Sequence, residues 1–154
     1  MIYADTSFLF SLYALDSNSA SAVRIYESDA RRPLIFTPWQ RFELRNTVRL
    51  AAHRLKRAGG VLPFSIGNAF KQIDEDLKSG VLRHAEPDWR ETFRLAESVS
   101  DQLTLSTGAG GVDTWHIASA ILLQAEVFWT FDDEQADMAS RLGKFKAVKC
   151  VPAS

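Results

Sequence analysis

Cysteine and histidine are scarce in this sequence, which has one Cys, at position 150, and three His among 154 residues. A single cysteine excludes an internal disulfide framework and fits a reducing compartment, with Cys150 serving ordinary packing. One thiol and three scattered imidazoles make neither a zinc site nor a thiol enzyme. Any metal-binding or catalytic chemistry therefore has to rest on other side chains.

Long apolar runs are also missing. The longest run, residues 117–131, is interrupted by Gln124 and Glu126 and falls short of the ~20 residues that a membrane-spanning helix needs. No basic region precedes the first apolar residues, and Asp5 interrupts them, so we expect no secretory signal. These features predict a cytoplasmic protein that does not contact a membrane.

Several motifs of common enzymes are absent. The glycine-rich segment 108–111 lacks the Lys-Ser/Thr of a phosphate-binding loop and does not complete a dinucleotide fingerprint. No serine lies in a nucleophile elbow. A phosphatase with an aspartate nucleophile at Asp5 would have a second aspartate two residues later, where this chain has Ser7. The net charge of −1 argues neither for nor against nucleic acid, because the positions of the charges decide that question.

What the sequence does contain is a regular alternation of strand-like and helix-like segments. A hydrophobic content of 46% over 154 residues predicts one globular domain, residues 1–154, that buries roughly two-thirds of its unfolded surface. We expect short strands at residues 2–4, 34–37, 81–85, 127–131 and 146–151, and helices after Asp5 and over residues 17–30, 39–58, 65–79, 88–105, 113–124 and 134–142. Strands separated by helices predict a three-layer α/β/α domain with a mainly parallel sheet.

Four carboxylates stand at the boundaries of these elements. Asp5 ends the first strand, Glu43 lies near the start of the long helix, Asp113 begins the helix after the glycines, and Asp132 ends the 127–131 strand. The carboxyl ends of parallel strands share one edge of a sheet, so these side chains can converge. At an effective dielectric of ~20, two charges ~4 Å apart repel by about 4 kcal/mol, which a fold tolerates by protonation or by binding a metal. Oxygen ligands favour Mg²⁺ or Mn²⁺.

Each carboxylate also has a structural alternative. Asp5, Asp113 and Asp132 are good helix N-caps, and Glu43 can favour the helix dipole. No Lys or Arg stands three or four residues from Glu43, so no intrahelical ion pair explains it.

Two neighbours of these acids are further candidates. Asp133 can substitute for Asp132 as a ligand. His116 can orient a carboxylate or water, or be a half-buried histidine with satisfied hydrogen bonds.

Four segments carry a resemblance to a known family: YADTSFLF, TPWQRFELRN, GVDTWHIASA and VFWTFDDEQ. In this order they span nearly the whole chain and resemble the PIN-domain family, most closely the VapC-type toxins of bacterial toxin–antitoxin pairs. The resemblance implies a PIN-like fold and a Mg²⁺-dependent endoribonuclease in which Asp5, Glu43, Asp113 and Asp132 are catalytic. Asp5, Asp113 and Asp132 are the implied metal ligands, with Mn²⁺ as a substitute ion. Thr6 or Ser7 matches the family's supporting hydroxyl. The glycine-rich loop before Asp113 departs from the family pattern.

The resemblance also implies partners: an RNA substrate, a cognate VapB-type antitoxin and a second copy in a homodimer. Arg41, Arg45 and Arg49 form a stripe on the long helix that suits RNA, a partner protein or plain solvent exposure. Apolar residues of this region are candidates for an antitoxin groove or for core packing: Trp39, Phe42, Leu62, Phe64 and Phe70. Two other functions stay open, namely a PIN-fold RNA- or protein-binding module with little catalysis, and a PIN nuclease of RNA processing without an antitoxin.

Overall fold

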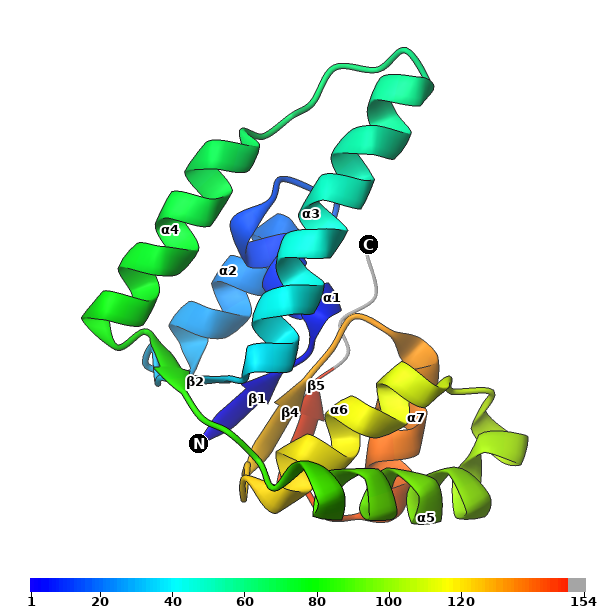
Figure 1. Cartoon of the computed structure of the whole chain (residues 1–154). Coiled ribbons are helices and arrows are strands. Elements are labelled where there is room, and N and C mark those ends of the chain that lie inside the picture. Colours follow the sequence, from blue (N-terminus) through cyan, green and yellow to red (C-terminus); the bar gives the residue numbers. More distant parts are fainter. Residues whose placement is uncertain (150–154) are drawn as a thin grey trace.

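A central parallel sheet organises the computed structural model, which describes residues 1–149 (Figure 1). Its strand order is β3-β2-β1-β4-β5, and every pairing is parallel. The strands are β1 (Ile2–Ala4), β2 (Leu34–Phe36), β3 (Leu82–His84), β4 (Val127–Trp129) and β5 (Ala147–Lys149). The three central strands, β1, β2 and β4, are buried along their whole length, as expected of parallel strands covered on both faces. Cys150 and the last residues of the predicted 146–151 strand lie outside the described residues.

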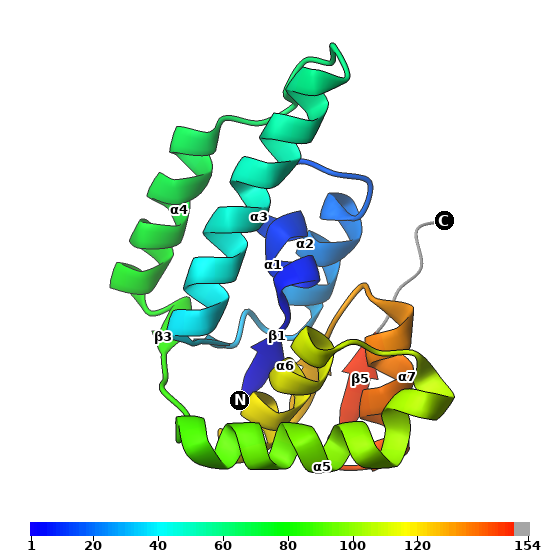
Figure 2. The same ribbon diagram turned by 45° about the vertical axis from the view of Figure 1, so that its right-hand side comes forward.

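Helices cover both faces of this sheet, which confirms the predicted three-layer α/β/α fold with a parallel sheet. The helices are α1 (Thr6–Tyr13), α2 (Ser19–Ser28), α3 (Pro38–Arg57), α4 (Ile66–Ser79), α5 (Trp89–Thr107), α6 (Gly111–Leu122) and α7 (Asp133–Leu142). One core cluster joins Ile2 and Ala4 of β1 to α1–α4, and the other joins Tyr3 to α5–α7. Figure 2 shows these two groups of helices on opposite sides of the strands.

Three helices begin directly after a strand, and a side chain caps each of them. Asp5 accepts a hydrogen bond from the N–H of Phe8 in α1, and Asp132 accepts one from Gln135 in α7. Thr37 caps α3 in a reciprocal capping box with Gln40. These caps place the starts of α1, α3 and α7 at the carboxyl edge of the sheet, where α/β proteins bind ligands.

Some predicted boundaries are wrong. Helix α6 begins at Gly111, so Asp113 is its third residue and not its cap. Gly108, with a φ of +80°, ends α5 two residues beyond the predicted end. Strand β4 ends at Trp129, because the backbone then turns into the cap of α7. In α3 the buried residue after Val48 is Ala52, whereas Ala51 and Leu55 are half-buried. Among the described residues, no helix has both the length and the apolar character to cross a membrane.

Candidate active site

A cavity of about 420 Å³ lies where α1, α3, α6 and the β4–α7 connection meet. All four predicted carboxylates line it: Asp5, Glu43, Asp113 and Asp132. His116 lines it as well, and no Lys or Arg is among the described residues of its wall. The fold therefore brings together four acids from distant parts of the sequence without an adjacent cation. Asp133 is not part of this wall.

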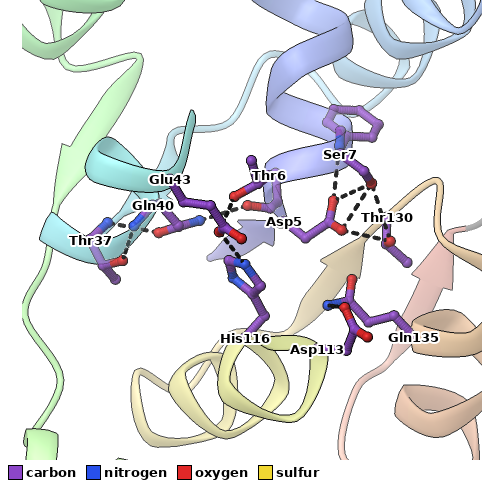
Figure 3. A network of polar contacts seen from close by, with 12 residues as sticks. Asp5, Thr6, Ser7, Thr37, Gln40, Glu43, Asp113, His116, Thr130 and Gln135 are labelled. Carbon is purple, nitrogen blue, oxygen red and sulfur yellow. Dashed lines mark hydrogen bonds and ion pairs between the residues drawn. The ribbon is translucent and has the colours of Figure 1, made fainter. Parts of the chain in front are cut away.

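Asp5 is the most deeply buried of these acids, with 4% of its surface exposed. Its carboxylate accepts hydrogen bonds from Ser7 Oγ (2.7 Å), Thr130 Oγ1 (2.9 Å) and the N–H of Phe8 (2.9 Å), as Figure 3 shows. Burial raises the pKa of Asp5 in spite of these bonds and the nearby His116. Asp5 is thus both a helix cap and a cavity residue, so the two predicted roles coexist in one side chain.

Glu43 belongs to a chain of hydrogen bonds that crosses the site (Figure 3). Thr6 Oγ1 donates to its Oε2, and His116 Nε2 lies 2.7 Å from the same oxygen. The other ring nitrogen of His116 lies 2.9 Å from the hydroxyl of Tyr3. Burial raises the pKa of Glu43, but the hydrogen bonds and charge of His116, with the Thr6 hydroxyl, outweigh it and leave that pKa below its ordinary value. Glu43 is therefore an ionised acceptor at neutral pH.

Asp113 lies in the first turn of α6, and Asp132 is the N-cap of α7. The charge of Asp132 acts on Asp113. Burial raises the pKa of Asp113 despite a 2.7 Å hydrogen bond from the N–H of Gly110, and the charge of Asp132 raises it further. A Cβ on Gly110 would lie 3.3 Å from Asp113 Oδ2, so glycine permits this close approach. The glycine-rich loop thus holds the Asp113 carboxylate in place.

Several polar residues of the site were not singled out in the sequence. Thr130 donates to Asp5 and accepts from the N–H of Asp132, so it ties two acids together. Gln135 is fully buried, and its Nε2 lies 3.4 Å from Asp113 Oδ1. Thr130 directly follows β4, and a polar residue after a buried strand is a signal that could have identified it. The two hydroxyls of Thr6 and Ser7 are both used, on Glu43 and Asp5 respectively.

The donor set of the cavity fits a hydrated Mg²⁺ better than a tightly chelated ion. Carboxylate oxygens are the ligands that Mg²⁺ prefers, and Mg²⁺ commonly keeps several waters while binding one or two carboxylates directly. Among the described residues, no three acids, histidines or cysteines are close enough together to hold one ion directly. Burial raises the pKa of Asp5 and of Asp113, and the described wall of the cavity has no Lys or Arg to oppose this effect.

The arginine stripe of α3 packs against α4. Arg41 and Arg45 lie 3.2 Å and 3.6 Å from Asp74, and the guanidinium groups of Arg45 and Arg49 stand 4.1 Å and 4.9 Å from the ring centre of Phe70. The stripe therefore joins two helices. Its continuation at the end of α3 is exposed: Arg54, Lys56 and Arg57.

The predicted groove residues divide between two places. Phe64 and Phe70 pack on the α1–α4 core, whereas Trp39 lies beside Trp115 of α6. A nearly apolar hollow of about 300 Å³, here called the aromatic pocket, is lined by Trp39, Trp89, Phe93, Gly111, Val112 and Trp115. Val112 lines both this pocket and the acidic cavity. Phe93 is 65% exposed at its rim, and Phe42, which contacts Trp39, is 63% exposed.

Comparison with known proteins agrees with this architecture. The crystal structure of FitAcB from Neisseria gonorrhoeae superposes with a TM-score of 0.60 and 15% identity over 97% of both chains. The crystal structure of PAE2754 from Pyrobaculum aerophilum superposes with a TM-score of 0.54 and 19% identity, covering 96% of this chain and 81% of that one. No family model and no curated protein matches the sequence. At these identities the likeness establishes the three-layer α/β/α fold alone, and the activity has to be argued from the cavity.

Proposed function

We propose that this protein is a Mg²⁺-dependent endoribonuclease and the toxin of a VapBC-type toxin–antitoxin pair. One observation carries the proposal: four carboxylates from four separate segments line one cavity whose described wall contains no Lys or Arg. Such a cavity repels an anionic phosphodiester unless a cation enters with it. Asp5, Asp113 and Asp132 would hold Mg²⁺, and Mn²⁺ has the same ligand preference. When bound, the ion supplies positive charge to the scissile phosphate and lowers the pKa of a water.

The residues around Glu43 keep it ionised and fix its position. Its lowered pKa keeps it ionised at neutral pH, and Thr6 and His116 fix its orientation by binding Oε2. In the proposed reaction, water attacks phosphorus and its proton passes to Glu43 or Asp132. The bond from phosphorus to one ribose oxygen breaks, and that oxygen takes up a proton. No covalent bond to the enzyme is needed.

The proposed substrate and partners rest on the sequence segments that resemble VapC-type toxins. These segments support RNA as the substrate and a VapB-type antitoxin as the inhibitor. The exposed rings of Phe42 and Phe93 support a protein contact at the aromatic pocket, for which we propose the homodimer.

A PIN-fold binding module is the second candidate, because Asp5 and Asp132 both make the cap hydrogen bonds that a purely structural role requires. A nuclease of RNA processing is the third, and it would act without an antitoxin.

The test is cleavage of total cellular RNA by protein freed of any bound antitoxin, in Mg²⁺, Mn²⁺ or EDTA. Asp5→Asn is compared with Asp137→Asn, an exposed acid of α7 whose ion pair with Arg141 contributes little. We expect discrete fragments that require metal, disappear in Asp5→Asn and persist in Asp137→Asn. Absence of cleavage with every metal by a folded protein would favour the binding module. If the purified protein cleaves RNA but no antitoxin gene lies beside its own gene, the result would favour a nuclease of RNA processing.

A further inference from the structure

The loop between α1 and α2 reaches the acidic cavity. Asp16 and Asn18 of this loop line the cavity together with the four carboxylates. Ser17, between them, is exposed and is not part of the wall. The loop therefore presents one further acid and one amide to whatever enters the cavity.

Asp16 fixes the loop through its hydrogen bonds. Its Oδ1 accepts hydrogen bonds from the N–H of Asn18 (2.9 Å) and from Ser19 Oγ (3.0 Å). Its Oδ2 accepts from Ser11 Oγ of α1 (2.8 Å). With both oxygens engaged, Asp16 anchors the backbone of Asn18 to α1.

The side chain of Asn18 is left without a role inside the protein. Asn18 stands at the N-cap of α2, where an asparagine oxygen ordinarily accepts from an N–H of the first turn, yet it makes no side-chain cap bond. Its Oδ1 is buried and has no hydrogen-bond partner among the described residues. A buried acceptor without a partner is unfavourable, so a rotation of the Asn18 amide that brings Oδ1 to a donor in the cavity would be favourable.

The unpaired Oδ1 of Asn18 restricts the chemistry of the ligand. An ionised phosphate has acceptors only and cannot satisfy Oδ1 of Asn18. A nucleobase edge offers a donor and an acceptor side by side, which matches the oxygen and the NH₂ of an amide. Single-stranded RNA exposes such edges and stacks its bases on aromatic rings. Phe10 lines the same cavity, half-buried, with its ring edge-on to Phe64 at 6.1 Å between centroids.

We infer that Asn18 reads a nucleobase of single-stranded RNA beside the scissile phosphate, with Phe10 as the stacking surface. The inference rests on the proposed nuclease function and assigns that nuclease a determinant of sequence preference. Stacking on Phe10 accepts every base, whereas the amide of Asn18 distinguishes among them.

The experiment measures binding of labelled single-stranded oligo(A), oligo(C) and oligo(U) by fluorescence anisotropy in Ca²⁺. The wild type should prefer one polymer by roughly 5- to 150-fold, the range for one amide–base contact. Asn18→Leu, which keeps the size and removes both hydrogen-bonding groups, should equalise the three affinities. Ser17→Ala is the matched control and should keep the preference. Phe10→Leu should weaken the binding of all three polymers to a similar extent. The melting temperature of Asn18→Leu should equal that of the wild type, because no cap bond is lost.

Cleavage mapping separates this inference from the nuclease proposal. Loss of base preference in Asn18→Leu supports the inference even if no metal produces cleavage. Equal binding of all three polymers by the wild type, no binding of any, or an unchanged preference in Asn18→Leu would overturn it. RNA cut by both proteins at the same bases would leave the nuclease standing and remove Asn18 from substrate reading.

Discussion

Nε2 of His116 lies 2.7 Å from Oε2 of Glu43, and this contact joins the two layers of helices across the edge of the sheet. His116 is only 2% exposed and lies on α6, whereas Glu43 projects from α3 on the other side. The ring also lies within hydrogen-bonding distance of the Tyr3 hydroxyl from β1. His116 is therefore more buried than the predicted half-buried histidine, and both of its ring nitrogens have hydrogen-bond partners, one of which is a carboxylate of the cavity.

Replacement of His116 should shift the acid side of the activity profile. In His116→Gln the charge that lowers the pKa of Glu43 is gone, so burial should raise that pKa. As the pH is lowered, the variant should therefore lose activity at a higher pH than the wild type does. At acidic pH its activity should be about tenfold lower for each unit by which the pKa of Glu43 rises. The measurement is the pH profile of RNA cleavage. His53→Gln, on the exposed side of α3, is the control and should match the wild type. An unshifted acid limb in His116→Gln would show that Glu43 does not titrate in the reaction.

Removal of one charge from the cavity should separate stability from metal binding. The pKa of Asp113 is raised, so its contribution to folding is greatest at low pH and is lost as the pH rises through that pKa. Asp113→Asn keeps an oxygen for the N–H of Gly110 and should melt at the same or a higher temperature than the wild type at pH 7. Mg²⁺ at 100 times its Kd should stabilise the wild type by about 2.7 kcal/mol and the variant by much less. Thermal melts with Mg²⁺ and with EDTA test both points, and an equal Mg²⁺ shift in the two proteins would remove Asp113 from the ligand set.

Stability at alkaline pH should depend on Tyr13. Its hydroxyl donates to Asp76 of α4 at 2.8 Å, and burial together with that carboxylate raises the pKa of Tyr13 far above its ordinary value. The unfolded chain therefore loses the Tyr13 proton first as the pH rises above about 10, and the folded state loses stability there. Tyr13→Phe should lower the free energy of unfolding by about 1 kcal/mol at pH 7 and decline less steeply above pH ~10. Urea titrations from pH 7 to 11 measure both effects, and parallel pH curves would contradict the assignment.

The aromatic pocket should control oligomeric state. Phe93 is 65% exposed at its rim, so Phe93→Ser should leave the monomer folded while removing apolar area from the proposed dimer contact. We expect the dimer to weaken at least tenfold in light-scattering or sedimentation measurements. Leu105→Ser, at the other end of α5 and fully exposed, is the matched control. A wild-type protein that stays monomeric at high concentration would refute the contact.

The pattern of apolar segments was sufficient to predict the layers and most of the helices. Short apolar stretches such as Leu34–Phe36 alternate with amphipathic stretches, and only a covered parallel sheet accommodates both. Boundaries at α6 were less predictable, because Gly110 acts as a cap without a side chain and shifts Asp113 inward by three residues. In α3, Ala52 is buried and the adjacent Ala51 is only half-buried, because the neighbouring helices decide which side of a helix is covered.

Neighbouring residues are enough to place the acids, because Asp5 and Asp132 follow buried strands and cap the next helices. The surroundings of these acids, in contrast, come from the packing of distant segments. The contact of His116 with Glu43, the bonds of Thr130 to Asp5 and the free amide of Asn18 all depend on segments brought together by the order of the strands. Hydrogen bonds and charges act over a few ångströms in space, and residues 73 or 125 positions apart give no local signal of such contacts.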